Sequence, residues 1–89
     1  MRIQIDPHTL ERAEERGTNE NEIREVVRNG FPITAKYGRQ GCAKIYSFRQ
    51  RRNNVYYEQK KVEVFYTIEK SVIVTVTVYV FYGRWEGKG

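Results

Sequence analysis

Near its C-terminus the chain contains an uninterrupted run of β-branched and aromatic residues, from Val72 to Tyr82. Such residues favour extended backbone, so the run predicts a long strand over 72–82. Alternation along that strand puts five valines on one face, namely Val72, Val74, Val76, Val78 and Val80. The other face presents Ile73, Thr75, Thr77, Tyr79 and Phe81. We expect the valine face to pack on helices. We also expect the strand to lie centrally, paired on both sides, because an exposed edge of this composition would aggregate.

A first helix is predicted close to the N-terminus, after a short strand over 3–5. Asp6 is a typical helix N-cap, and Pro7 suits the first helical position, where its missing N–H costs nothing. Gly17 adopts the left-handed conformation that ends many helices. These signals predict a helix over 7–16.

A second helix is predicted immediately after the first. Asn19 is a suitable N-cap, and Glu22 three residues later completes the pattern of a capping box. Apolar residues then recur at helical spacing until Gly30, which predicts a helix over 20–29. The short connection between the helices indicates a tight helical hairpin.

From residue 31 onward the apolar residues alternate, as in strands. We predict strands over 33–37, 43–49, 56–68 and 72–82, the third with a break near residues 58–60. A length of 89 residues suits one domain. The sequence therefore predicts an α+β fold, a single domain over 1–89 in which two N-terminal helices pack on one face of a curved antiparallel β-sheet.

The basic residues are concentrated after residue 30. Residues 1–30 contain five Lys and Arg against seven Asp and Glu, whereas residues 31–89 contain eleven against four. Aromatic residues alternate with the cations, a combination typical of proteins that hold single-stranded nucleic acid. An acidic protein partner would fit the same charge. Six cations are the candidate RNA contacts: Lys44, Arg49, Arg51, Arg52, Lys60 and Lys61.

Other classes of function lack the residues that they need. Cys42 is the single cysteine and His8 the single histidine, so the chain has neither a disulfide nor a zinc tetrad. We find no phosphate-binding glycine loop and no nucleophile elbow, and we expect no metal and no cofactor. No segment resembles an export signal or a membrane span, which predicts a cytoplasmic protein without a membrane partner.

Polar residues gather on one side of the first predicted helix. His8, Arg12 and Glu15 lie nearly opposite its apolar side, and a helix N-terminus disfavours the charged form of His8, as a general base requires. A solvated helix face with an Arg12–Glu15 pair would explain the same pattern. Metal-free RNA cleavage needs a base, an acid and cations near the phosphate. The catalytic candidates are His8, Arg12, Tyr79 and Arg84, placed where the open face of the sheet meets the polar side of this helix.

The pattern His8-x-x-x-Arg12-x-x-Glu15-Arg16-Gly17, followed by the capping box, resembles the opening of a bacterial domain-of-unknown-function family grouped with RelE-like and BrnT-like toxins. The family's basic β-meander and closing strand are matched by Thr75-Val-Thr-Val-Tyr79, so the resemblance extends over nearly the whole chain. The chain departs from the family at Thr18, where a hydrophobic residue is usual; a looser helical hairpin is the expected consequence.

The resemblance implies a RelE-like fold and a specific activity. Active toxins of this superfamily are endoribonucleases that cleave mRNA, often on the ribosome, and are held by a small antitoxin protein. We therefore expect a toxin that binds RNA on its basic sheet, with an antitoxin as partner. The alternatives are a non-catalytic module that binds RNA or an acidic protein, and an interaction domain whose charge only keeps it soluble.

Overall fold

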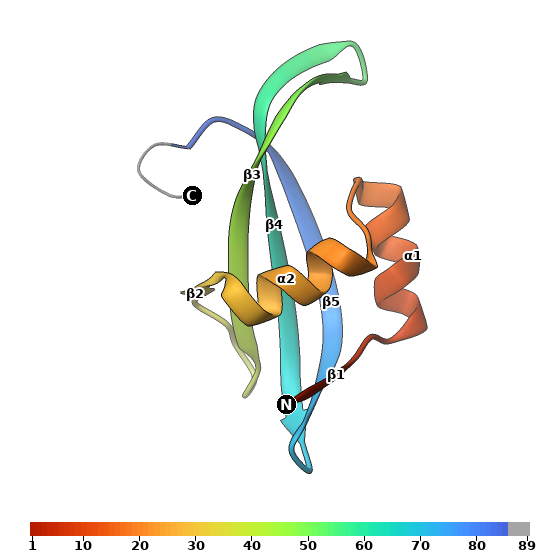
Figure 1. Ribbon diagram of the computed structural model, residues 1–89, viewed down its shortest axis with the longest axis vertical. Helices are drawn as coiled ribbons and strands as arrows, with labels where there is room; N and C mark the ends of the chain where they lie inside the picture. The colour runs from red at the N-terminus through yellow and green to blue at the C-terminus, as the bar shows by residue number, and fades with distance from the viewer. Residues whose placement is uncertain (86–89) are drawn as a thin grey trace.

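The computed structural model describes residues 1–85. It has two helices and one sheet of five strands, which confirms the α+β class (Figure 1). The elements are β1 (Arg2–Gln4), α1 (Pro7–Arg16), α2 (Glu20–Asn29), β2 (Phe31–Ile33), β3 (Gln40–Arg52), β4 (Val55–Glu69) and β5 (Val72–Gly83). Both helices have the predicted bounds. The long strands extend beyond the predicted ones, and β4 continues without the expected break at 58–60. The predicted strand over 33–37 is wrong, because β2 ends at Ile33 and residues 34–39 form a loop.

The sheet is mixed, not wholly antiparallel. Its strand order is β1-β5-β4-β3-β2, and β1 runs parallel to β5, with Ile3 beside Ile73. The other three pairs are antiparallel, as expected from hairpin connections. The parallel pair arises because the N-terminal segment adds to the free edge of β5, where it buries Ile3.

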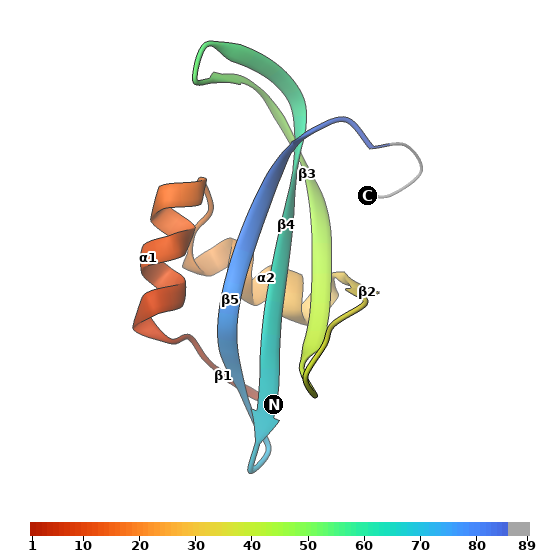
Figure 2. The same ribbon diagram turned by 180° about the vertical axis from the view of Figure 1, so that it is seen from behind.

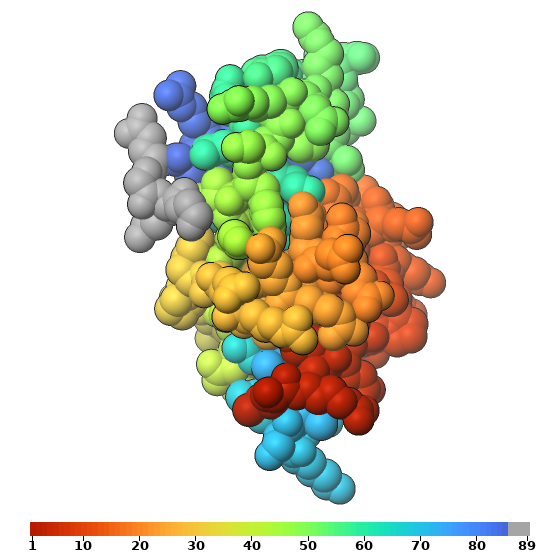
Figure 3. Space-filling model, in the orientation of Figure 1, coloured from red at the N-terminus to blue at the C-terminus, as the bar shows by residue number. Residues whose placement is uncertain are grey.

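Both helices lie on the same face of the sheet, as predicted. In Figure 1 α2 crosses in front of β3 and β4 while α1 lies beside β5; Figure 2 shows the opposite face without a helix. The buried core between the layers consists of Ala13, Ile23, Val26, Val62, Val64 and Val78. Figure 3 shows the helices covering the middle of this side of the molecule. Neither α1 nor α2 is long and apolar enough to cross a membrane.

The predicted valine face of β5 is interrupted. Val78 belongs to the core and Val80 packs against it, but Thr75 is also buried on the helix side. A β-bulge explains this spacing, because Thr75 pairs with Tyr66 and Thr77 with Phe65, which leaves Val76 as the extra residue. The alternation therefore shifts at the bulge, and the prediction of one continuous valine face is wrong for the first half of the strand.

The strand β5 is also less central than predicted. It pairs with β1 only over Val72–Val74, and α1 covers the edge that follows. The contacts are polar: the Thr75 hydroxyl accepts from Asp6 N–H (3.0 Å) and donates to Thr9 (3.1 Å). The helix α1 thus protects this edge of β5 from pairing with a strand of another chain, which is the role that the prediction gave to a neighbouring strand.

The hairpin of β3 and β4 projects beyond the rest of the sheet. Because β5 ends opposite Gln59, residues 48–58 extend past it as a two-stranded arm, seen at the top of Figure 1. A register shift between Ser47 and Gln50 bends the arm at its base. Asn53 and Asn54 form its tight turn with positive φ at both positions.

Candidate nucleic-acid interface

The face of the sheet away from the helices combines aromatic rings with cations. We call this the open face and define it by residues of β4 and β5: Lys61, Glu63, Phe65, Thr77, Tyr79 and Phe81. The Phe65 and Tyr79 rings meet edge to face (5.9 Å), and Tyr79 and Phe81 lie 6.4 Å apart. Tyr79 and Phe81 remain exposed. These rings are therefore accessible for stacking.

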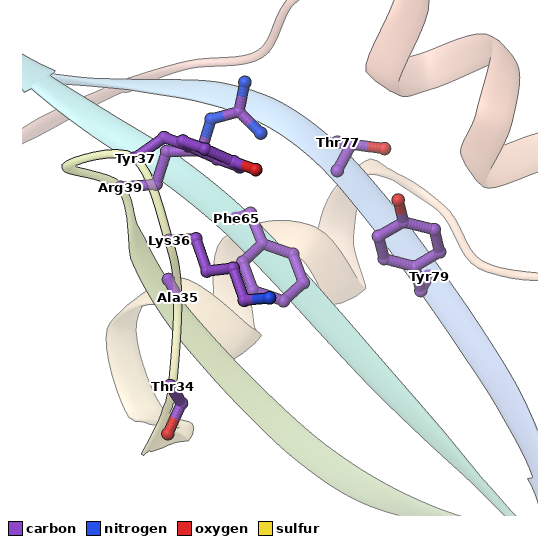
Figure 4. A pocket seen from close by; sticks show the side chains of 8 residues that line it. All are labelled: Thr34, Ala35, Lys36, Tyr37, Arg39, Phe65, Thr77 and Tyr79. Atoms are coloured by element: carbon purple, nitrogen blue, oxygen red, sulfur yellow. The ribbon is translucent and has the colours of Figure 1, made fainter.

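A pocket of about 280 Å³ lies on the open face. Phe65, Thr77 and Tyr79 line it on the sheet, and the loop between β2 and β3 lines it with Thr34, Ala35, Lys36, Tyr37 and Arg39. Figure 4 shows the loop side chains and Tyr79 on either side of the Phe65 ring. None of the lining residues is acidic, so an anionic ligand meets no lining carboxylate.

Arg16 connects α1 to the open face. Its Nη1 donates to the carbonyl of Val78 (2.6 Å), and its guanidinium lies 4.9 Å from the centre of the Tyr79 ring. A guanidinium has five N–H donors, so this bond leaves it able to bind a phosphate as well. Our sequence analysis missed Arg16. The available signal was its position one helical turn after Arg12.

The predicted catalytic residues are only partly brought together. Tyr79 lies on the open face, and Arg84 is exposed just after β5. His8 and Arg12 are on the solvent side of α1, where their described partners are Glu11 (3.8 Å) and Glu15 (3.3 Å). Arg16, not His8 or Arg12, is thus the α1 residue in contact with Tyr79.

Two of the predicted RNA contacts lie on the helix-covered face. Lys44 pairs with Glu25 (3.0 Å), which also accepts from the Tyr46 hydroxyl (2.7 Å). The Tyr46 hydrogen bond and Lys44 lower the pKa of Glu25, whereas burial and Glu25 raise that of Tyr46. Lys60 pairs with Glu22 (2.8 Å), and its side chain is only 11% exposed. Both lysines hold α2 to the sheet.

The C-terminal end of α1 is capped by side chains of the sheet. The last carbonyls of a helix lack partners within it; here Arg52 donates to Glu15 (2.8 Å), Tyr82 to Arg16 (2.7 Å) and Lys60 to Gly17 (2.9 Å). Gly17 itself has a left-handed φ of 96° and donates to the Ala13 carbonyl. Arg52, a predicted RNA contact, thus has a structural partner.

The helical hairpin contains a polar contact at Thr18, the position that departs from the family pattern. Thr18 is buried, and its hydroxyl donates to Glu22 (2.7 Å), the partner of Lys60. Asn19 caps α2 by accepting from the Glu22 N–H (2.9 Å). The Glu22 carboxylate therefore accepts hydrogen bonds from both Thr18 and Lys60, whereas in a capping box it would accept from the backbone N–H of Asn19.

Of the remaining predicted RNA contacts, Arg49 and Arg51 are exposed, whereas the Lys61 side chain is 24% exposed and pairs with Glu63 (3.2 Å). On the arm, Arg49 lies 4.0 Å from Glu58, and Arg51 donates to the Asn54 carbonyl (3.2 Å). Lys61 is on the open face, with its ammonium 5.6 Å from the Phe81 ring centre and 5.4 Å from that of Trp85. Adjacent Lys60 and Lys61 thus lie on opposite faces.

The described residues 1–85 contain no group of three His, Cys, Asp or Glu side chains that could hold a metal ion. Cys42 is half-buried, with its sulfur 3.9 Å from the Tyr66 hydroxyl. The ionisable side chains on the open face are Lys61, Glu63 and Tyr79, and Arg16 contacts Tyr79 from α1.

Comparisons with protein-family models, with curated proteins and with solved structures gave no match. The candidate interface consequently rests on the geometry of the chain itself: exposed rings, a pocket without carboxylates, and an arginine that reaches the open face across the edge of β5.

Proposed function

We propose that this protein is a RelE-like toxin, a metal-free endoribonuclease that binds single-stranded RNA on the open face. The observation that supports this best is the contact of Arg16 with Tyr79 beside the pocket, since it joins a cation, a phenol and a binding cavity. The family resemblance of the sequence supports the same activity. The function requires a cytoplasmic protein, and a small antitoxin would be its protein partner.

The reaction assigns a separate role to each type of side chain. A base removes the proton of a ribose 2′-hydroxyl, whose oxygen bonds to phosphorus while the bond to the 5′-oxygen breaks. An acid then gives a proton to the departing 5′-oxygen. Tyr79 is our candidate for one proton transfer, and Arg16 and Arg84 are candidates to stabilise the phosphorane charge. His8 and Arg12 take part only if RNA also contacts the solvent side of α1.

Cleavage of single-stranded RNA by the purified protein in the presence of EDTA tests this proposal. The substitution Tyr79→Phe keeps the aromatic ring and removes the hydroxyl. The turnover number for RNA cleavage should therefore fall by about 10²- to 10⁴-fold, with little change in RNA affinity. Arg16→Met and Arg84→Ala should also lower turnover, whereas Tyr56→Phe, on the arm, is the matched control. A strand with 2′-O-methyl ribose should bind without being cut. Equal cleavage by Tyr79→Phe and wild type would refute the role of Tyr79.

A non-catalytic RNA-binding module is the second candidate. The observation that favours it is that two predicted catalytic residues, His8 and Arg12, do not join Tyr79 on the open face. Their contacts are with Glu11 and Glu15 on α1. This candidate predicts RNA binding without cleavage and no growth defect when the protein is produced. Growth arrest that is relieved by the product of a neighbouring gene would favour the toxin. Binding to an acidic protein but not to RNA would contradict both.

A further inference from the structure

The pocket of the open face is formed by two distant parts of the chain. The sheet provides its floor with Phe65 and Tyr79, and the loop of residues 34–39 provides the opposite wall (Figure 4). A volume of about 280 Å³ lies just below the usual range for drug-sized ligands, ~300–1,000 Å³. The cavity therefore suits one planar ring system better than a large folded cofactor.

The backbone of Tyr37 has an unfavourable positive φ, although its ring packs little against the rest of the fold. It lies in a tight turn with positive φ at both central residues, Tyr37 (60°) and Gly38 (71°), closed by a hydrogen bond from Arg39 N–H to the Lys36 carbonyl (3.2 Å). Positive φ is unfavourable for a bulky residue. Yet Tyr37 is 88% exposed, and the Arg39 guanidinium lies 6.0 Å from its ring centre. The exposed ring is therefore accessible to a ligand.

The charged residues that line the pocket are both positive. Lys36 and Arg39 lie on either side of Tyr37 in the loop, and Arg16, outside the lining, contacts the lining residue Tyr79. An aromatic ring between cations fits a ligand that is flat and apolar on its faces and anionic at its ends. An unstacked nucleotide has this combination, because its base stacks while its flanking phosphates accept hydrogen bonds from Lys and Arg.

We propose that this pocket binds one unstacked nucleobase of single-stranded RNA, stacked on Tyr37, with Lys36 and Arg39 beside the flanking phosphates. The inference rests on the proposed function and adds a feature of the substrate to it. Recognition depends on the flat face of the base, so it requires a base at this position without selecting its identity.

The test uses two short 2′-O-methyl strands that cannot be cleaved through the 2′-oxygen. One is abasic at every position, and the other has a single 2-aminopurine and is otherwise abasic, so only one base can occupy the pocket. From the free energy of stacking one base on an aromatic ring, we expect the wild type to bind the single-base strand about 5- to 100-fold more tightly than the abasic strand. The fluorescence of 2-aminopurine should fall on binding, since stacking on an aromatic ring quenches it.

Variants of Tyr37 relate the effect to the pocket. Tyr37→Gly removes the ring and suits the positive φ, so the fold should be retained. It should bind both strands equally; Tyr37→Phe should keep the preference, and Tyr56→Ala on the arm should leave it unchanged. The proposal is overturned if wild type binds both strands equally, or if Tyr37→Gly keeps the preference. If the wild type binds neither of the two test strands nor ordinary single-stranded RNA, the proposed function is overturned as well. If it binds the abasic and the single-base strand equally, only the proposal for the pocket is overturned.

Discussion

Lys60 and Lys61 are adjacent cations with different contacts, so a structural role and the proposed RNA-binding role can be tested separately. Lys60 donates to the Gly17 carbonyl (2.9 Å) and pairs with Glu22 (2.8 Å), whereas Lys61 lies on the open face near Phe81. We predict that Lys60→Met lowers the free energy of unfolding and leaves RNA binding by the folded protein unchanged. Lys61→Met should lower RNA affinity and cost less stability than Lys60→Met.

The size of the Lys60 effect follows from its burial. Its side chain is 11% exposed and that of Glu22 is 21% exposed. Removing one partner of a fully buried pair costs about 3–5 kcal/mol, and an exposed pair contributes about 0–1 kcal/mol. We expect about 2–4 kcal/mol, because Lys60→Met also leaves a helix-end carbonyl without this donor. For a domain of this size that lowers the melting temperature by roughly 8 °C or more. Lys61→Met should cost less, since its ammonium has one ion pair at 3.2 Å.

Chemical denaturation and RNA titrations at several salt concentrations measure the two effects. Each phosphate contact on a single strand contributes about 0.7 to the slope of log affinity against log salt, so Lys61→Met should reduce that slope by about this amount. Adding Glu22→Gln to Lys60→Met should restore part of the lost stability, because it removes the unpaired carboxylate. A salt slope that falls in Lys60→Met but not in Lys61→Met would refute the assignment of the two faces.

Three further predictions concern other contacts. Tyr82→Phe removes the donor to the Arg16 carbonyl and should lower the free energy of unfolding by about 1–3 kcal/mol, measured in urea. Glu25 has a lowered pKa, so its contribution to stability is present above its unfolded value of 4.5 and is lost as the pH falls below it. Glu25→Gln should therefore flatten the dependence of stability on pH in that acid range, and an unchanged profile would contradict the effect. Arg51→Ala should leave stability within about 0.5 kcal/mol and reduce the salt slope of RNA affinity if the arm contacts phosphate.

The helices could be predicted to the residue because their limits depend on local chemistry. Asp6 accepts the His8 N–H, Asn19 accepts the Glu22 N–H, and Gly17 takes the left-handed conformation. Each of these signals depends on residues within a few positions of the helix end, so the sequence alone is enough to predict it.

The arrangement of the sheet depended on contacts that alternation alone does not encode. Val76 has the same local pattern as its neighbours, yet it is the extra residue of the bulge. Thr75 takes the buried position because Thr9 and Asp6 of the N-terminal segment satisfy its hydroxyl. Such a partner, 66 residues away for Thr9, can be identified only after the fold brings it near.

The candidate site was partly predictable from the alternation of side chains between the two faces of each strand. Lys60 alternates in phase with the buried Val62 and Val64, which already assigns it to the helix side, whereas Lys61 alternates with Phe65. Arg16 and Tyr37 could not be assigned in this way. Arg16 reaches the open face by crossing a strand edge, and Tyr37 lies in a loop where alternation does not apply.

The cations of the basic sheet differ in the partners that they contact. On the helix side, Lys44, Lys60 and Arg52 are each engaged by a carboxylate or a carbonyl, so these cations join the helices to the sheet. Because these bonds complete the C-terminal end of α1 and partly buried ion pairs with α2, loss of one of the cations should affect folding before it affects binding. On the open face, the ring of Tyr37 adds little packing to the fold, so its removal should affect binding first. Net charge alone cannot separate these groups; contact with a helix can, because Lys44, Lys60 and Arg52 bind groups of α1 or α2, whereas Lys61 pairs with Glu63 of its own strand.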